Sequence, residues 1–172
     1  MNLLHLKAIE PQAHPMVKLK LDRIIEYLFS KNYALKLQPE MDQAYLLLKI
    51  EGKEYPLFIR ILDGENFLQL LVFFPEAIKK GCFNDMARLL HLINKEIDVP
   101  GFCMDEENGF VFYRLLIPAI NQEIDEGLLE TYIKSCELLS KTFSPAIENV
   151  ANGDLDFETV FQRTQEEKKH TL

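Results

Sequence analysis

The chain lacks the motifs that mark the most recognisable chemistries. Its 172 residues contain no phosphate-binding glycine-rich loop, no Gly-x-Ser-x-Gly turn and no His-Glu-x-x-His zinc motif. The three cysteines, Cys82, Cys103 and Cys136, are odd in number and lack metal-ligand spacing. We therefore expect reduced thiols in a cytoplasmic protein, and the sequence predicts no catalytic residue, no cofactor and no metal.

Long hydrophobic runs and clustered positive charge are also missing. The longest apolar run, 67–75, is interrupted by Gln69 and is too short to cross a bilayer. Residues 1–9 contain a single lysine, and no small-residue cleavage site follows, so we expect neither a signal peptide nor membrane insertion. The 19 basic residues are outnumbered by 27 acidic ones, giving a net charge of -8. This deficit disfavours a nucleic-acid partner, which requires clustered cations.

Apolar periodicity, by contrast, is well marked along the chain. Residues recurring at three and four predict helices beginning at Met16, near Asn84, and near Gln122 or Glu123. The Ser144-Pro145 pair either kinks the third helix or starts a new one. A short helix over 156–163 and a frayed polar tail over 164–172 complete the chain. Strands are predicted over 33–37, 43–51, 54–62, 67–74, 102–105 and 110–117.

This order, α-β-β-β-β-α-β-β-α plus a short C-terminal helix, predicts an α+β fold with an antiparallel sheet. Consecutive strands with helices between the groups are not the pattern of a doubly wound fold. We divide the chain into an N-terminal arm over 1–15, a single α+β domain over 16–153, and a short helix with a polar tail over 154–172.

The predicted strands 67–74 and 110–117 are apolar on both of their alternating faces. This is unusual for an antiparallel sheet that has one face in water. A few hundred Å2 of apolar surface left uncovered, at roughly 25 cal/mol per Å2, is on the order of 10 kcal/mol of unrealised burial. Either the C-terminal helix or the N-terminal arm covers the second face, or a homodimer mate or client protein does. The residues expected to bind a partner are Phe67, Leu71, Phe73, Phe110, Phe112 and Arg114.

The isolated polar residues favour structural roles. We expect His91 to be a surface or boundary residue, Cys136 to lie in the core, and the carboxylate clusters to serve turns and helix starts. Arg60 and Arg114 each interrupt an apolar strand. Each could bind a carboxylate bidentately, but we favour a place at a sheet edge, with the stem packed and the head in water.

Three segments carry a family resemblance: 87–94, the strand region 108–118, and 142–150, in that order. Together they resemble the YbjN family of candidate bacterial sensory transduction regulators. The resemblance covers roughly residues 17–153. It implies a fold similar to that of type III secretion chaperones, which are small, acidic, α+β, commonly dimeric and cytoplasmic. It supplies no catalytic residues.

The sequence is compatible with two functions of different classes. The first is a non-enzymatic module that binds a protein, either a client or a second copy of the chain, through apolar surface. The second is a small-molecule sensor or an unrecognised enzyme that uses Arg60, Arg114 and Tyr113 in a closed polar pocket. A structural subunit of a larger assembly is a third possibility.

Overall fold

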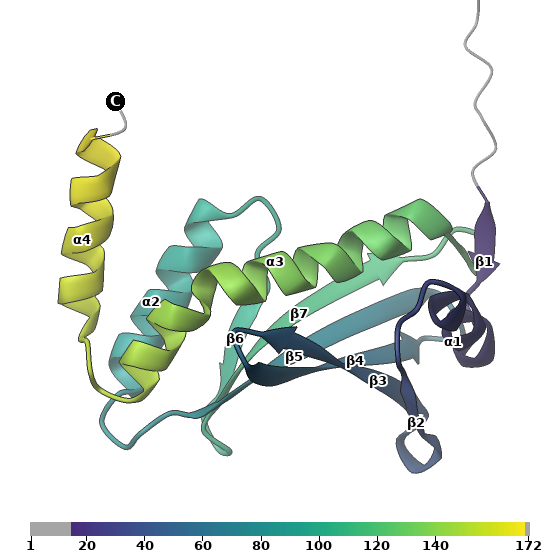
Figure 1. Ribbon diagram of the computed structural model, residues 1–172, viewed down its shortest axis with the longest axis horizontal. Helices are drawn as coiled ribbons and strands as arrows, with labels where there is room; N and C mark the ends of the chain where they lie inside the picture. Colours follow the sequence, from purple (N-terminus) through teal and green to yellow (C-terminus); the bar gives the residue numbers. More distant parts are fainter. Residues whose placement is uncertain (1–14, 171–172) are drawn as a thin grey trace, which may run out of the picture.

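A computed structural model describes the backbone of residues 15–170 and the side chains of residues 15–166 (Figure 1). The predicted N-terminal arm, 1–15, lies outside the described residues except for Pro15. The elements are β1 (Met16–Lys18), α1 (Leu21–Ser30), β2 (Lys36–Gln38), a 3-10 turn (Pro39–Met41), β3 (Gln43–Ile50), β4 (Lys53–Leu62), β5 (Phe67–Ala77), α2 (Phe83–Glu96), β6 (Phe102–Asp105), β7 (Phe110–Pro118), β8 (Glu123–Asp125), α3 (Glu126–Ala151) and α4 (Phe157–His170).

Six of the strands form one antiparallel sheet in the order β2-β3-β4-β5-β7-β6. Helix α3 runs along one face of this sheet and contacts β3, β5 and β7, while α1 packs near β3 and α2 beside β6 (Figure 1). The helices therefore gather on one side of the sheet. This arrangement confirms the predicted α+β class and the grouping of strands into sets of four and two.

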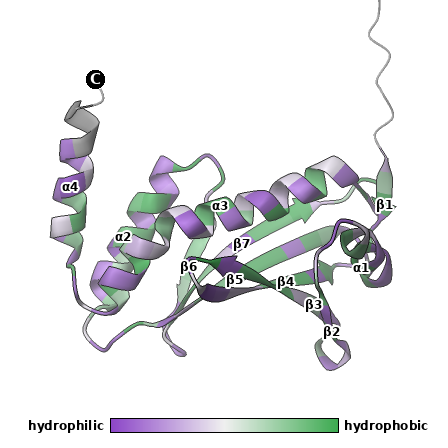
Figure 2. Ribbon diagram, in the orientation of Figure 1, coloured by the Kyte–Doolittle hydropathy of each residue, from purple (hydrophilic) through white to green (hydrophobic). Residues whose placement is uncertain are grey.

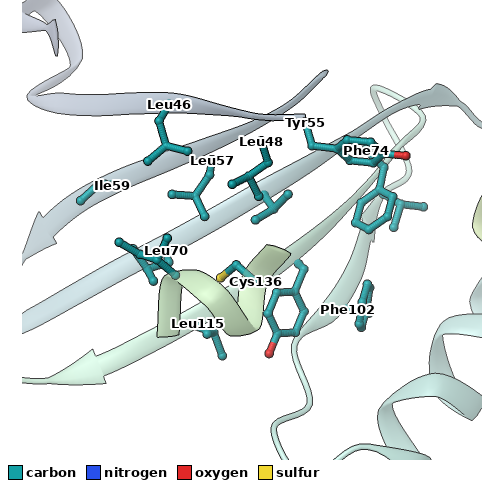
Figure 3. Close-up of a cluster of buried hydrophobic side chains, with 14 of the residues drawn as sticks. Leu46, Leu48, Tyr55, Leu57, Ile59, Leu70, Phe74, Phe102, Leu115 and Cys136 are labelled. Atoms are coloured by element: carbon teal, nitrogen blue, oxygen red, sulfur yellow. The ribbon is translucent and has the colours of Figure 1, made fainter. Parts of the chain in front are cut away.

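The core lies between the sheet and α3. Inward-facing leucines from β3, β4, β5 and β7 surround Cys136 of α3, which is completely buried (Figure 3). Burial raises the pKa of the Cys136 thiol to about 12, so it stays protonated and apolar at neutral pH. The prediction that Cys136 is a core residue is confirmed.

The start of the chain differs from the prediction. Residues 16–18 form a strand, and the first helix begins only at Leu21. Strand β1 pairs antiparallel with β8, which places Val17 opposite Ile124, and both side chains are buried. Val17 happens to stand one helical turn before Leu21, so its spacing suggested a longer helix. The partner strand that overrides this local pattern is more than one hundred residues away in sequence.

The third helix also starts later than predicted, at Glu126, because residues 123–125 belong to β8. The Asp125 carboxylate caps the helix by accepting a hydrogen bond from the Leu128 backbone N–H at 2.7 Å. The helix then continues through Pro145 to Ala151, so Ser144-Pro145 does not begin a new helix.

Helix α4 is longer than the predicted 156–163 and continues to His170, through most of the expected polar tail. The Asp156 carboxylate accepts a hydrogen bond from the Thr159 N–H at 2.8 Å and so caps the start of the helix. Beyond Thr164 the residues are glutamine, glutamate and lysine, which are good helix formers. Their polarity suggested a frayed tail although their intrinsic preference is helical.

A substitution at Gly101 tests the packing between β6 and β7. A Cβ at this position would lie 2.3 Å from the carbonyl oxygen of Arg114, a backbone atom that cannot move aside. We predict that Gly101→Ala lowers the free energy of unfolding by about 2 kcal/mol or more in urea denaturation. Gly127→Ala is the matched control, because Gly127 lies in the first turn of α3 with only a side-chain oxygen nearby. The control should change the free energy of unfolding by less than about 1 kcal/mol, because the helix preference of alanine is offset by a 3.3 Å approach to the side-chain oxygen of Asp125 that caps α3. Equal behaviour of the two variants would contradict this account.

Candidate functional site

The sheet has a second face, opposite α3, on which none of the described helices packs. We call it the open face. Figure 2 shows hydrophobic colouring along much of β4, β5 and β7, the strands that form its centre. The side chains that alternate with the buried set, and so define the open face, are Tyr45, Leu47, Lys49, Glu54, Pro56, Phe58, Arg60, Leu62, Phe67, Gln69, Leu71, Phe73, Cys103, Asp105, Phe110, Phe112, Arg114 and Leu116.

All six residues that the sequence assigned to partner binding lie on the open face. On β5 and β7 the register pairs Leu71 with Arg114 and Phe73 with Phe112, so these four side chains are immediate neighbours. Phe110 lies beyond an irregularity in the pairing between Phe73 and Ala77. The structure therefore brings the predicted residues together on one surface.

An aromatic row crosses this surface. It consists of one ring from each of four adjacent strands: Tyr45, Phe58, Phe73 and Phe112. Neighbouring ring centroids lie 5.5 to 5.8 Å apart, within the range for favourable edge and tilted aromatic contacts. Each ring is half-buried by its neighbours rather than by an overlying element. The row is a preformed apolar strip that keeps part of its surface in water.

Tyr45 and Phe58 were not among the predicted partner-binding residues. The signal that identified β5 and β7 is present in their strands as well, because Tyr45 precedes the buried Leu46, and Phe58 lies between the buried Leu57 and Ile59. Checking both alternating faces of every predicted strand for apolar residues would have identified all four members of the aromatic row.

Arg60 and Arg114 lie on the open face, but not at a sheet edge. Strand β4 runs between β3 and β5, and β7 runs between β5 and β6, so the predicted edge positions are wrong. The Arg114 guanidinium carbon lies 5.9 Å from the Phe112 ring centroid, a distance that permits a cation–π contact. Both arginines line a hollow of about 210 Å3 together with Leu71 and Phe73.

Asp105 lines the same hollow, but its carboxylate is engaged in the turn between β6 and β7. It accepts hydrogen bonds from the backbone N–H groups of Glu107 and Asn108, each at 3.1 Å, and from the Asn108 side chain at 2.7 Å. The hydrogen bonds from the Asn108 side chain and backbone hold the pKa of Asp105 below its usual value. The carboxylate thus serves a turn, as predicted for its cluster.

Tyr113 does not join the two arginines. It is buried on the opposite, helix-covered face, and its hydroxyl donates a hydrogen bond to the Val99 carbonyl oxygen at 2.9 Å. Burial raises the pKa of this phenol well above its ordinary value. The expected grouping of Tyr113 with Arg60 and Arg114 is wrong because adjacent residues of a strand point to opposite faces. The hollow beside the arginines lies on the open face and lacks Tyr113.

The C-terminal helix does not cover the open face. Helix α4 packs on α2 instead, at the end of the molecule (Figure 1). Arg88 of α2 forms an ion pair with Glu158 at 2.7 Å, and its guanidinium carbon lies 4.0 Å from the Phe157 ring centroid. Of the two internal covers considered from the sequence, the helix is therefore wrong, and the arm lies outside the described residues.

A groove of about 540 Å3 separates α2 from α4. His91 lines it and is exposed, which confirms the expected surface position. Within residues 15–166, no cluster of three or more potential metal ligands occurs. No helix in the described part of the chain is long and apolar enough to span a membrane.

The fold and the open face define an α+β protein in which the helices of residues 15–170 leave one apolar sheet face uncovered. A family model with the description "Putative bacterial sensory transduction regulator", the YbjN family, matches residues 20–149. The chain therefore belongs to the YbjN family, as the resemblance of segments 87–94, 108–118 and 142–150 indicated. No curated protein matches it significantly.

Adjacent leucines of β5 provide a direct test of which face is covered. Leu70 is fully buried on the helix side, whereas Leu71 is half-buried on the open face. We predict that Leu70→Ala lowers the free energy of unfolding by about 2–5 kcal/mol, and that Leu71→Ala lowers it by only about 1 kcal/mol. Urea denaturation of both variants measures the difference. Equal losses would mean that another part of the chain, or another copy, covers Leu71.

Proposed function

We propose that this protein is a non-enzymatic binding module that holds a protein partner against the open face of its sheet. The observation that carries the proposal is the continuous apolar surface across β3, β4, β5 and β7, over which no described helix packs. Contiguous exposed apolar surface of this kind characterises protein interaction sites.

The gain from covering the face is substantial. Leu116 and Phe110 keep 53% and 36% of their surface exposed, and the aromatic row is only half-buried. Burying apolar surface contributes roughly 25 cal/mol per Å2. A partner of standard size, which covers about 800 Å2 of one protein, would enclose most of the row together with these two side chains.

The sheet edges favour docking by side chains over addition of a strand. The outermost strands, β2 and β6, have three and four residues. Very short edge strands are one way in which folded proteins limit pairing with another chain. The open face offers broader contact than either edge, so the partner is expected to lie across the strands.

The charged groups support a binding role over catalysis. Each carboxylate with a lowered pKa has a structural partner: Asp105 in a turn, Asp156 at a helix start, and Glu130 beside Tyr27 and Lys31. Glu130 accepts a hydrogen bond from the Tyr27 hydroxyl at 2.6 Å and pairs with Lys31 at 3.2 Å. These carboxylates are committed to holding elements together.

The partner is either a client protein or a second copy of the chain. A client would make the protein similar in action to the type III secretion chaperones that its family resembles, with a cytoplasmic location. The family description adds a regulatory context. A regulator of this kind would act by capturing or releasing a partner, not by changing a substrate chemically.

Affinity purification from the source cell tests the proposal. We predict that tagged wild-type protein retains a partner that Phe112→Asp loses, because the substitution removes a ring from the aromatic row and places a hydrated carboxylate beside Arg114 on the docking surface. Leu138→Asp is the matched control, since Leu138 is 63% exposed on α3, away from the open face. It should retain the partner. The purified partner must then bind the isolated wild type in calorimetry.

Light scattering on the isolated protein separates the two occupants. A homodimer that Phe112→Asp dissociates, and that Leu138→Asp leaves intact, would make the second copy the partner. Equal partner recovery and equal mass for all three proteins would contradict a binding role for the open face. Circular dichroism confirms that each variant is folded.

A further inference from the structure

Two positive charges stand on the open face of an acidic protein without a negative partner. The chain has a net charge of -8, yet neither Arg60 nor Arg114 forms an ion pair within residues 15–166. Arg23, Lys53 and Arg88 have carboxylate partners, whereas several exposed lysines of the described region, such as Lys80 and Lys141, have none. The position of Arg60 and Arg114 at the centre of the open face is what distinguishes them. The two arginines are therefore available to a group from outside.

The register places these arginines on either side of β5. Arg60 pairs with Gln69, whereas Arg114 pairs with Leu71, two residues along the same strand and on the same face. Adjacent strands are about 4.8 Å apart and successive residues rise about 3.3 Å along a strand, so the two Cα atoms are separated by about 12 Å across β5. Both side chains line the hollow of about 210 Å3, within which one carboxylate could meet both guanidinium groups.

The other residues of the hollow do not supply that carboxylate. Asp105 is the acidic residue that lines it, and its oxygens accept the three hydrogen bonds that form the β6–β7 turn. Leu71, Phe73 and Phe112 contribute apolar walls. The hollow thus combines two guanidinium groups that lack an ion pair with three apolar side chains, Gln69 and the carboxylate that is bound into the turn.

Docking a purely apolar segment here would be costly. Covering the open face removes water from both guanidinium groups, and a desolvated charge is strongly unfavourable unless it is paired. A carboxylate satisfies this requirement especially well, because it matches the planar guanidinium fork with two parallel hydrogen bonds. Among apolar partner segments, those that carry a carboxylate are therefore expected to bind more tightly than those that lack one.

We propose that the open face recognises a protein segment in which apolar side chains flank an aspartate or glutamate, and that Arg60 and Arg114 bind this carboxylate together. The inference rests on the proposed function and adds to it the chemistry of the partner. The apolar side chains meet the aromatic row, while the carboxylate enters the hollow beside Leu71. The arginines are thus specificity-determining residues of the surface.

Selection of random peptides on phage against the full-length protein tests this inference. Wild type is expected to enrich peptides with an acidic residue between apolar ones. The selected peptide and its amide counterpart, with glutamine or asparagine in place of the acid, are then synthesised for calorimetry. Replacing the acid should weaken binding by about tenfold or more, the size expected for a charge-assisted pair.

Two charge-matched variants locate the effect. Arg114→Met keeps an apolar stem but removes one of the two guanidinium groups. It should weaken binding of the acidic peptide by about tenfold and reduce the preference for the acidic peptide over its amide counterpart. Lys49→Met removes one positive charge at the far end of the same face, where Lys49 is exposed and paired in register with Glu54. It should leave the preference for the acid unchanged. A similar loss of affinity for the acidic peptide in both variants would mean that net charge alone causes the effect, and would overturn the inference.

The remaining outcomes separate this inference from the proposed function. Peptides that bind, and that Phe112→Asp abolishes, but that show no acid preference would overturn the arginine role while leaving the binding module in place. Enrichment of no peptide at all would count against both. A dimer dissociated by Phe112→Asp would make a second copy the occupant. A synthetic peptide of residues 1–14 that competes with the probe would make the chain's own segment the occupant. Either result would overturn the assignment to a partner segment.

Discussion

The strict alternation of side chains along antiparallel strands is the constraint on which this structure depends. Strands β5 and β7 are apolar at nearly every position, so each presents apolar side chains to both faces of the sheet. Helix α3 can lie on only one of these faces, and it contacts β3, β5 and β7 there. The second apolar set then points away from all the described helices. The open face is thus a consequence of composition within the strands.

Polar contacts at one end of the covered face hold α3 in place. Lys53 of β4 pairs with Glu76 of β5 and, at 2.8 Å, with Glu148 of α3. The Tyr55 hydroxyl donates a hydrogen bond to the same Glu148 at 3.0 Å, and burial is the main cause that raises the pKa of Tyr55 to about 12. The helix is therefore tied to β4 by charge as well as by packing, and Lys53 links this contact to β5. A sheet supported in this way offers a partner a preformed surface, and preorganisation limits the ordering cost of binding.

The features that could be predicted from the sequence are those that a local pattern of apolar residues encodes. Sequence reasoning located β3 to β7, the two-faced character of β5 and β7, and six residues of the open face, because period-two alternation directly records which residues share a face. It placed the short strand β2 at 33–37, three residues before its observed start at Lys36. It missed the β1–β8 pair, since strands that pair across a hundred residues leave no local signal. It also placed Arg60 and Arg114 at edges, because strand order is a property of the whole sheet. The length of α4 was missed for a different reason, since polarity was given more weight than the helix preference of glutamate and lysine.

The central claim is that the open face is accessible in the free protein while the opposite face is not. Methyl NMR with a soluble paramagnetic agent measures this directly on neighbouring leucines of the same strands. The account predicts strong relaxation enhancement for Leu71 and Leu116 and protection for Leu70 and Leu115, which are 0% and 5% exposed. Strong protection of Leu71 and Leu116 in the isolated monomer would show that the chain covers its own second face, and would contradict the account.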